Sequence, residues 1–392
     1  MAIKVRVLSL NCWALPLKWP FGSSDHLFRL KKLEEALLES HYDFVALEEV
    51  WCESDFLQLR EVLEKPYPFG HYFHSGFTGS GICVFSRHRI VSTLMYRFTL
   101  NGFAHHIHRG DWFGGKGVGL VQVEIEQYQI NFYVAHLHAE YNQKNDSYLP
   151  HRLAQAFELA QFVKHTSCSA DVLILMGDFN IEPDDLAYSL IMKNANLLDA
   201  WVQKPNFTED CGATYGRADN CYTPQSQKNK GFSGQRLDYV MYRRVRSNIE
   251  TKLCEIALNC IPGEKLNYSD HVGICAEFVV SDHHNSVQIT KELSPVSSDL
   301  LKEVIQILEQ GLSRITFDRR IFFGFVVLLA LINLLTFFLD IYFPSIKVGM
   351  QILRFFFTLL IGFCVWYSCI GLTLEHKALK ASKASINMLL ND

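Results

Sequence analysis

Two polar residues follow an apolar run near the middle of the chain, and their types suit metal or phosphate chemistry. Residues 171–180 read Asp-Val-Leu-Ile-Leu-Met-Gly-Asp-Phe-Asn, so the run ends in Gly, Asp178 and Asn180. Such a run predicts a strand buried on both faces, and ligands bind at the ends of such strands in open α/β sheets. In extended backbone, Asp178 and Asn180 would point the same way. They could hold a hard cation or a phosphate oxygen, or simply form a turn.

Polar side chains at the ends of other predicted strands extend this pattern. Residues 42–47 predict a buried strand that leads into Glu48 and Glu49, and residues 128–135 lead into His136. The complete set is Asn11, Glu49, His136, Asp178, Asn180, Asp238, Asp270 and His271. Its oxygen ligands suit Mg²⁺ better than Zn²⁺, and it holds no Ser or Cys in an activating context. The set predicts water attack on a phosphodiester, with a metal polarising the phosphoryl oxygens and a His accepting the proton.

The pair His136 and His138 also permits a zinc-hydrolase interpretation. Nothing nearby in the sequence supplies the other ligands of such a site, so this interpretation is disfavoured. A strand would place both side chains on one face. A satisfied histidine in the core is the expectation for His138.

Residues 110–117, Gly-Asp-Trp-Phe-Gly-Gly-Lys-Gly, nearly spell a phosphate-cradling loop. The motif fails at Gly117, where Ser or Thr would be needed for Mg²⁺. On the residues alone, Lys116 could be a solvated loop residue. The aromatic residues around it could enter a bilayer interface or belong to the core; they are Phe103, Trp112 and Phe113.

Composition limits the possible partners and compartments. The chain has 392 residues, a formal net charge of −4 and eleven cysteines. This charge gives no basic footprint for nucleic acid, so no nucleic-acid partner is expected. The cysteines form no CxxC pair, and residues 2–10 alternate like a strand and are too charged for a secretory signal. We expect a reducing compartment and free, mostly buried thiols.

The remaining periodicity predicts an α/β fold. Apolar residues at helical spacing predict helices near 27–38 and 150–163. Further strands are predicted by the first residues of the chain and by segments 82–85, 119–125, 236–241 and 269–278. Strands that alternate with helices and with hairpin-like connections indicate a sandwich of mixed sheets.

The C-terminal third has a different composition. Residues 281–298 are typical of a linker, and apolar residues between 300 and 312 follow an amphipathic helical pattern. Residues 321–339 and 355–374 contain no charge, and each is long enough for a transmembrane helix. Both runs have basic outer flanks, which the positive-inside rule places in the cytosol; these flanking residues are Arg314, Arg319, Arg320, Lys377, Lys380 and Lys383.

Seven short motifs occur in the order used by the endonuclease/exonuclease/phosphatase superfamily. They are Asn-Cys-Trp13, Leu-Glu-Glu-Val-Trp51, Ser-Gly-Ile-Cys-Val-Phe-Ser86, His-Leu-His-Ala-Glu-Tyr141, Gly-Asp-Phe-Asn180, Arg-Leu-Asp-Tyr239 and Ser-Asp-His271. The chain resembles the neutral, magnesium-dependent sphingomyelinase branch, by motif over residues 1–280 and by architecture in the tail. The resemblance implies a deoxyribonuclease-I-like four-layer sandwich of two mixed β-sheets flanked by helices, followed by a two-helix transmembrane hairpin.

The resemblance also implies a role for each site residue. Glu49 is similar to the principal ligand of Mg²⁺, for which Mn²⁺ could substitute, with Asn11 beside it and Asp270 close to the metal. Asp178 and Asn180 match the pair that orients the attacking water and the phosphate. His271 matches the catalytic base and Asp238 its orienting carboxylate. His136 resembles a second histidine that stabilises the transition state or protonates the leaving alkoxide. Lys116 lies in a stretch with a counterpart in this branch, which implies a contact of Lys116 with the substrate phosphate.

The implied reaction is hydrolysis of sphingomyelin, or a related choline phospholipid, to ceramide and phosphocholine at a bilayer. Alternatives are a lyso-phospholipid-cleaving phospholipase C, of the kind that acts on lyso-platelet-activating factor, an inositol-phosphate phosphatase, an endonuclease and a noncatalytic membrane scaffold. The acidic balance disfavours DNA, the segment before Tyr239 lacks the Trp-Cys-Asp-Arg pattern of the inositol phosphatases, and a scaffold would be expected to lose part of the set.

The expected organisation has five parts: a catalytic domain at 1–280, a linker at 281–298, an amphipathic juxtamembrane helix at 299–318, a transmembrane hairpin at 319–376 and a basic cytosolic tail at 377–392. We expect a multi-pass protein of an endomembrane such as the endoplasmic reticulum, with its catalytic domain in the cytosol.

Overall fold

The structure, a computed structural model, describes residues 2–16, 22–142, 144–205, 207, 211–229, 231, 233–282 and 296–391. The chain divides into two compact units. The first comprises residues 1–101 and 110–297, and the second comprises residues 102–109 and 298–392.

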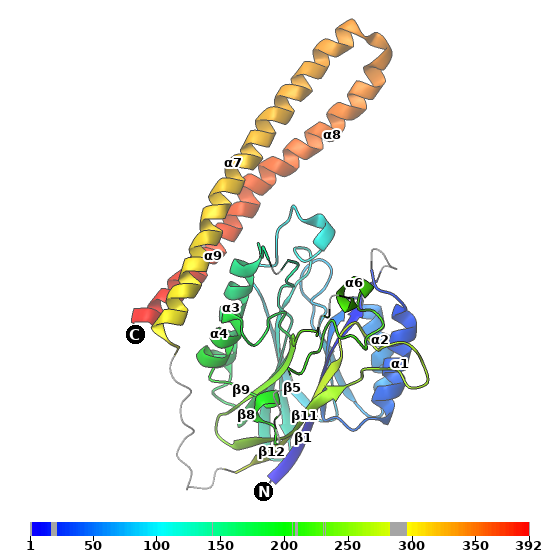
Figure 1. Ribbon diagram of the computed structural model, residues 1–392, viewed down its shortest axis with the longest axis vertical. Helices are drawn as coiled ribbons and strands as arrows, with labels where there is room; N and C mark the ends of the chain where they lie inside the picture. The colour runs from blue at the N-terminus through cyan, green and yellow to red at the C-terminus, as the bar shows by residue number, and fades with distance from the viewer. Residues whose placement is uncertain are drawn as a thin grey trace. The chain divides into compact units, whose positions relative to one another are not determined.

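The first unit contains two six-stranded mixed sheets (Figure 1). One has the order β11-β12-β1-β2-β4-β3, in which β1 and β2 are parallel and the other neighbours antiparallel. Its strands are β1 (Ala2–Ala14), β2 (Phe44–Val50), β3 (Phe69–Tyr72), β4 (Cys83–Ser86), β11 (Asn248–Ala257) and β12 (Gly273–Ser281).

The second sheet has the order β5-β6-β7-β8-β10-β9, and its parallel pair is β7 with β8. Its strands are β5 (Ile90–Arg97), β6 (Gly117–Ile125), β7 (Tyr128–Ala135), β8 (Val172–Asp178), β9 (Leu198–Asp199) and β10 (Asp238–Arg244). The continuous apolar run before Asp178 is buried at every position of β8, as predicted for a strand covered on both faces.

The two sheets pack face to face and are covered by helices on their outer faces (Figure 1). Phe44 of β2 stacks on Phe132 of β7, with ring centroids 4.1 Å apart. Leucines of α1 and α2 pack on the outer face of the first sheet. The helices are α1 (His26–Glu39), α2 (Glu53–Leu63), α3 (Leu149–Thr166) and α4 (Leu186–Asn194), with one-turn helices α5 (Ala200–Gln203) and α6 (Gln225–Lys228). The predicted four-layer sandwich is confirmed.

The second unit is helical. The helix α7 (Ser298–Tyr342) continues without a break from the predicted amphipathic segment through the first apolar run. A short turn at Pro344–Ile346 leads to α8 (Lys347–Trp366), a π-helical turn at Tyr367–Gly371, and α9 (Leu372–Asn391). Among the residues that the structure describes, two helical spans are long and apolar enough to cross a membrane, at Ser298–Leu339 and Pro344–Asn391. The segment 102–109 packs with these helices, and Arg314 lies 3.8 Å from the ring centroid of Phe103.

The structure bears on the expected linker and on the expected state of the cysteines. Most of the expected linker, residues 283–295, lies outside the described residues. All eleven cysteines are free, as predicted. The expectation that most of them are buried is wrong, because only Cys12, Cys83, Cys254, Cys275 and Cys364 are buried.

Candidate active site

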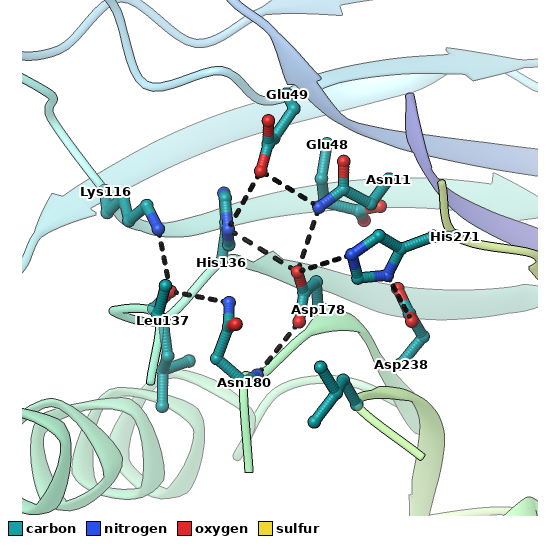
Figure 2. A network of polar contacts seen from close by, with 12 residues as sticks. Asn11, Glu48, Glu49, Lys116, His136, Leu137, Asp178, Asn180, Asp238 and His271 are labelled. Carbon is teal, nitrogen blue, oxygen red and sulfur yellow. Dashed lines mark hydrogen bonds and ion pairs between the residues drawn. The ribbon is translucent and has the colours of Figure 1, made fainter. Parts of the chain in front are cut away.

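The ends of six strands bring the predicted residues together (Figure 2). Asn11 lies in β1 beside the Glu48 position of β2, and Glu49 follows at the next position. In the second sheet, Asp178 at the end of β8 is directly opposite Asp238 at the start of β10. The remaining residues flank strands: His136 follows β7, and Asp270 and His271 precede β12. Residues far apart in sequence therefore converge at one edge of the sandwich.

Asn11 links the two sheets at this edge. Its Nδ2 donates to Oε1 of Glu49 at 3.1 Å and to Oδ2 of Asp178 at 2.9 Å. Its Oδ1 accepts a hydrogen bond from the Trp13 backbone N–H at 3.0 Å. The amide fixes the two carboxylates, one from each sheet, while leaving each of them lone pairs for a further partner.

His271 is held between two carboxylates. Its Nδ1 is 2.9 Å from Oδ2 of Asp238, and its Nε2 is 3.9 Å from Oδ2 of Asp178. Burial lowers the pKa of His271, but the charges of Asp238 and Asp178 outweigh it, so the pKa lies well above its usual value. Since Nδ1 is occupied by Asp238, Nε2 is the atom that faces the reaction site.

His136 occupies a different electrostatic environment. Its Nε2 lies 3.6 Å from Oδ2 of Asp178 and 3.8 Å from Oε1 of Glu49. Burial, with a smaller effect of the Lys116 charge, holds the pKa of His136 well below its usual value. This imidazole is neutral at pH 7 and can donate a hydrogen bond, whereas His271 is the more basic of the two.

Lys116 is buried in a polar cluster. Its Nζ lies 3.1 Å from Oδ1 of Asp111 and donates to the Leu137 carbonyl at 3.1 Å. The same carbonyl accepts a hydrogen bond from Nδ2 of Asn180 at 3.1 Å. Lys116 is therefore not a solvated loop residue. Residues 110–117 lead into β6 rather than into a helix, so they do not form the nucleotide-binding type of loop.

His138 belongs to the protein interior. Its Nδ1 is 2.8 Å from the Ala139 carbonyl oxygen, and its ring stacks on Tyr148 with centroids 4.2 Å apart. Burial lowers the pKa of His138 to about 3, although the charge of Asp111 opposes the shift. The expectation of a core histidine agrees with this environment.

The backbone turns directly after β8, between Asp178 and Asn180. Oδ1 of Asp178 accepts a hydrogen bond from the Asn180 backbone N–H at 2.9 Å, and Asn180 has a φ of 51°. The side chains therefore do not share one face of an extended segment, and that expectation is wrong. The end of β8 approaches the end of β7 closely at Gly177, because a Cβ there would lie 2.0 Å from the Ala135 carbonyl oxygen. Only glycine fits at this position.

Several carboxyl groups crowd together at this edge, and the chemistry of the donor set fits a divalent metal. Burial and the neighbouring Asp238 raise the pKa of Asp178 to about 7. Burial, with a contribution from Glu49, raises the pKa of Asp270. Asp178, Asp238 and His271 hold ligand atoms within 4.8 Å of one another. A bound cation would relieve this repulsion, and hard carboxylate oxygens are its preferred ligands.

Sequence reasoning missed three residues of the site. Glu48 is fully buried and accepts a hydrogen bond from the Ser9 hydroxyl at 2.9 Å. Tyr215 packs on His271 with ring centroids 4.8 Å apart. Asp111 pairs with Lys116. The Glu48-Glu49 pair was a visible signal for Glu48, whereas no local pattern marks Tyr215 or Asp111.

Glu49 has a backbone conformation that non-glycine residues seldom adopt, with a φ of 57°. Its Oε2 lies 3.5 Å from Nε1 of Trp51, and its Cα is close to Gly81. Strained backbone persists where the surrounding structure imposes it, often at functional sites. This conformation turns the Glu49 side chain toward Asn11 and His136 (Figure 2).

Comparison with known proteins gives a consistent result. Residues 8–283 match the model of the Endonuclease/Exonuclease/phosphatase family. A Caenorhabditis elegans protein that carries the name "Putative neutral sphingomyelinase" is 49% identical over 100% of this chain and 92% of its own length. Human sphingomyelin phosphodiesterase 2 is 40% identical over 71% of this chain and 65% of its own length. An inositol phosphosphingolipids phospholipase C from Schizosaccharomyces pombe is 31% identical over 80% of this chain and 76% of its own length.

Solved structures share the fold of the first unit at lower identity. Sphingomyelinase C from Streptomyces griseocarneus has a TM-score of 0.53 and 16% identity, covering 70% of this chain and 99% of that chain. A beta toxin variant from Staphylococcus aureus with bound magnesium ions has a TM-score of 0.51 and 17% identity, with the same coverage of 70% and 99%. At these identities the likeness concerns the fold alone.

Proposed function

The chain belongs to the endonuclease/exonuclease/phosphatase family, and on that basis we propose that it is a Mg²⁺-dependent phosphodiesterase that hydrolyses sphingomyelin to ceramide and phosphocholine. The observation that carries the mechanism is the orientation of His271. Asp238 binds one ring nitrogen at 2.9 Å, and the other nitrogen faces Asp178 at the centre of the site.

His271 acts as the general base. A water molecule beside Asp178 attacks the phosphorus atom, and Nε2 of His271 accepts its proton. Asp238 fixes the ring and stabilises the imidazolium that forms, which is the role of a carboxylate paired with a catalytic histidine. The bond between phosphorus and the ceramide oxygen breaks, and the ceramide oxygen takes a proton from solvent water. His271 returns its proton to solvent, and phosphocholine leaves with the oxygen of the attacking water.

The remaining polar residues stabilise the phosphoryl group. A divalent cation, which we propose is Mg²⁺ held by Glu49 with Asn11 and Asp270 close by, would neutralise charge on the phosphoryl oxygens. Neutral His136 donates a hydrogen bond from Nε2 to the phosphoryl group as negative charge grows in the transition state. Burial lowers the pKa of His136, and we therefore assign it this role in place of a proton transfer to the leaving oxygen. Lys116 and Asn180, which both donate to the Leu137 carbonyl, orient the phosphate.

The C-terminal helices support a membrane location. We propose that residues 1–280 form the catalytic domain, 281–298 a linker, 299–318 a juxtamembrane helix, 319–376 a membrane hairpin and 377–392 a basic tail. The basic flanks favour a cytosolic catalytic domain, and the free cysteines agree with a reducing compartment. An endomembrane such as the endoplasmic reticulum suits this topology. Anchoring would keep the enzyme at the surface that holds its lipid substrate.

A second candidate substrate is an inositol phosphosphingolipid, since the Schizosaccharomyces pombe relative carries that name. Both lipids contain a ceramide phosphodiester, so one mechanism serves both. Lyso-phospholipid remains a further alternative.

The test is release of the phosphorylated headgroup by purified full-length protein in mixed micelles. Sphingomyelin, inositol phosphosphingolipid and lyso-phosphatidylcholine are compared with Mg²⁺, with Mn²⁺ and with EDTA. Mg²⁺-dependent release of phosphocholine from sphingomyelin is expected. Faster cleavage of either other lipid would change the substrate and keep the mechanism, and cleavage of none would refute the hydrolase assignment.

A further inference from the structure

Phe77 is the most exposed large apolar side chain in the part of the chain that the structure describes. Its relative exposure is 88%, against 75% for the next, Tyr342, and 71% for Leu27, the next in the first unit. Exposed apolar residues are common on proteins, but a nearly free aromatic ring at one site requires a specific explanation. Phe77 lies between β3 and β4, in the loop of residues 75–81.

This loop is held by its backbone. The Phe77 N–H donates to the Phe113 carbonyl at 2.9 Å, and the Gly115 N–H donates to the Gly79 carbonyl at 2.8 Å. The two loops touch so closely that a Cβ at Gly115 would lie 2.3 Å from the carbonyl carbon of Ser75. Glycine is therefore required at that contact. The exposed ring of Phe77 is presented by a braced loop.

The same loop lies directly beside the proposed metal ligand. The Val50 N–H donates to the Gly81 carbonyl at 3.0 Å. A Cβ at Gly81 would lie 3.4 Å from the Cα of Glu49. The loop that carries Phe77 therefore packs against the backbone beside Glu49.

The composition of the loop selects the kind of partner. Residues 75–81 read Ser-Gly-Phe-Thr-Gly-Ser-Gly and contain no charged side chain, so entering an apolar phase carries no cost of burying a charge. One aromatic ring among small residues is far smaller than a stable protein interface, which buries about 800 Å² on each partner. Aromatic side chains are favoured in the interfacial layer of a bilayer.

We propose that Phe77 inserts into the interfacial layer of the membrane that contains the lipid substrate, and that this contact places Glu49 at the depth of the lipid phosphate. The inference rests on the proposed function, because a phosphodiester cleaved at Glu49 is attached to a lipid in the bilayer. The rim next to Glu49 must then meet the headgroup layer.

The test uses full-length protein reconstituted into phosphatidylcholine and sphingomyelin vesicles. Phe77→Trp introduces a fluorophore at the loop, and lipids brominated in the upper acyl chain quench indole groups that enter the interface. The matched control is Leu38→Trp, since Leu38 is 44% exposed. Leu38 lies at the end of α1 that leads into the start of β2, whereas Glu49 lies near the opposite end of that strand.

In the vesicles, the indole fluorescence that Phe77→Trp adds should shift to the blue and be quenched by brominated lipid. The fluorescence that Leu38→Trp adds should neither shift nor be quenched. Phe77→Asp should lower phosphocholine release from the vesicles by about tenfold or more. Leu38→Asp should leave it unchanged, and both Asp variants should keep the wild-type melting temperature.

The two hypotheses can fail separately. Unquenched emission from Phe77→Trp, in vesicles whose sphingomyelin the variant still cleaves, would overturn the membrane contact and leave the proposed function standing. If wild-type protein released no phosphocholine, the proposed function would fail. The quenching would still decide whether Phe77 enters the bilayer.

Discussion

Oδ2 of Asp238 lies 2.9 Å from Nδ1 of His271; Asp238 begins β10 of one sheet, and His271 lies just before β12 of the other. The contact leaves Nε2 facing Asp178 and raises the basicity of the ring. Asp238 is itself fixed because its backbone N–H donates to the Thr214 hydroxyl at 3.2 Å. The position and the protonation of the proposed base thus depend on the same carboxylate.

Asp238→Asn should slow sphingomyelin hydrolysis by roughly 10²–10⁴-fold, the range associated with a positioned acid or base. Asp43→Asn is a matched control, since Asp43 forms a second His–Asp pair with His88 at 2.8 Å, away from the site. The control should keep most of its activity. Equal losses in the two variants would show that the effect is structural.

The pH profile of hydrolysis should report the same contact. His271 is a base only when neutral, so kcat/KM should rise with pH through the pKa of His271, which the two carboxylates hold above its usual value of 6.5. Asp238→Asn removes one of these charges, so the midpoint should move to lower pH. An unchanged midpoint in Asp238→Asn would assign the titration to another group.

Asp178→Asn should stabilise the metal-free protein while abolishing activity. The pKa of Asp178 is raised from 3.8 to about 7, so the folded state holds this proton more tightly than the unfolded state. The contribution of the protonated Asp178 carboxyl to the free energy of unfolding is fully present below pH 3.8 and is lost as the pH rises toward 7. Above pH 7 the variant should be about 1–3 kcal/mol more stable in EDTA, as measured by urea unfolding. A less stable variant would indicate that Asp178 makes a net stabilising contact.

Mg²⁺ should raise the melting temperature of the wild-type protein. A ligand at 100 times its dissociation constant adds about 2.7 kcal/mol if it binds only the folded state. Glu49→Gln should lose most of this shift and most of the activity, and Glu53→Gln in α2, which is exposed, should keep both. If Glu49→Gln kept the full shift, the cation would bind elsewhere.

Lys116 and Asp111 should be coupled in stability. Breaking a buried ion pair from one side costs roughly 3–5 kcal/mol, because the remaining charge lacks its partner. Lys116→Met should therefore destabilise the protein more than the double variant with Asp111→Asn does. A double-mutant cycle by urea unfolding measures this coupling, and additive effects of the two substitutions would refute it.

The residues predicted from sequence converge because they sit at strand ends. Glu49 and Asp178 each follow a continuous apolar run, and the two strands belong to different sheets packed face to face. An apolar run identifies a buried strand, and sheet packing then brings the ends of such strands together. Their motifs also resembled a family whose fold is now confirmed.

Contacts made through loops were not predictable in this way. The turn at Asn180 depends on a left-handed backbone conformation, and the salt bridge of Lys116 with Asp111 depends on the path of a loop without periodicity. The packing of Phe103 with Arg314 joins segments more than two hundred residues apart. Local sequence carries no signal for such long-range pairs, so their partners emerge only from the structure.

The most direct test of the mechanism is hydrolysis of sphingomyelin in water enriched in the heavy oxygen isotope. Attack of water on phosphorus, with His271 as its base, predicts one heavy oxygen in phosphocholine and none in ceramide, and no turnover by His271→Ala. Heavy oxygen in ceramide, or release of free choline in place of phosphocholine, would contradict the account.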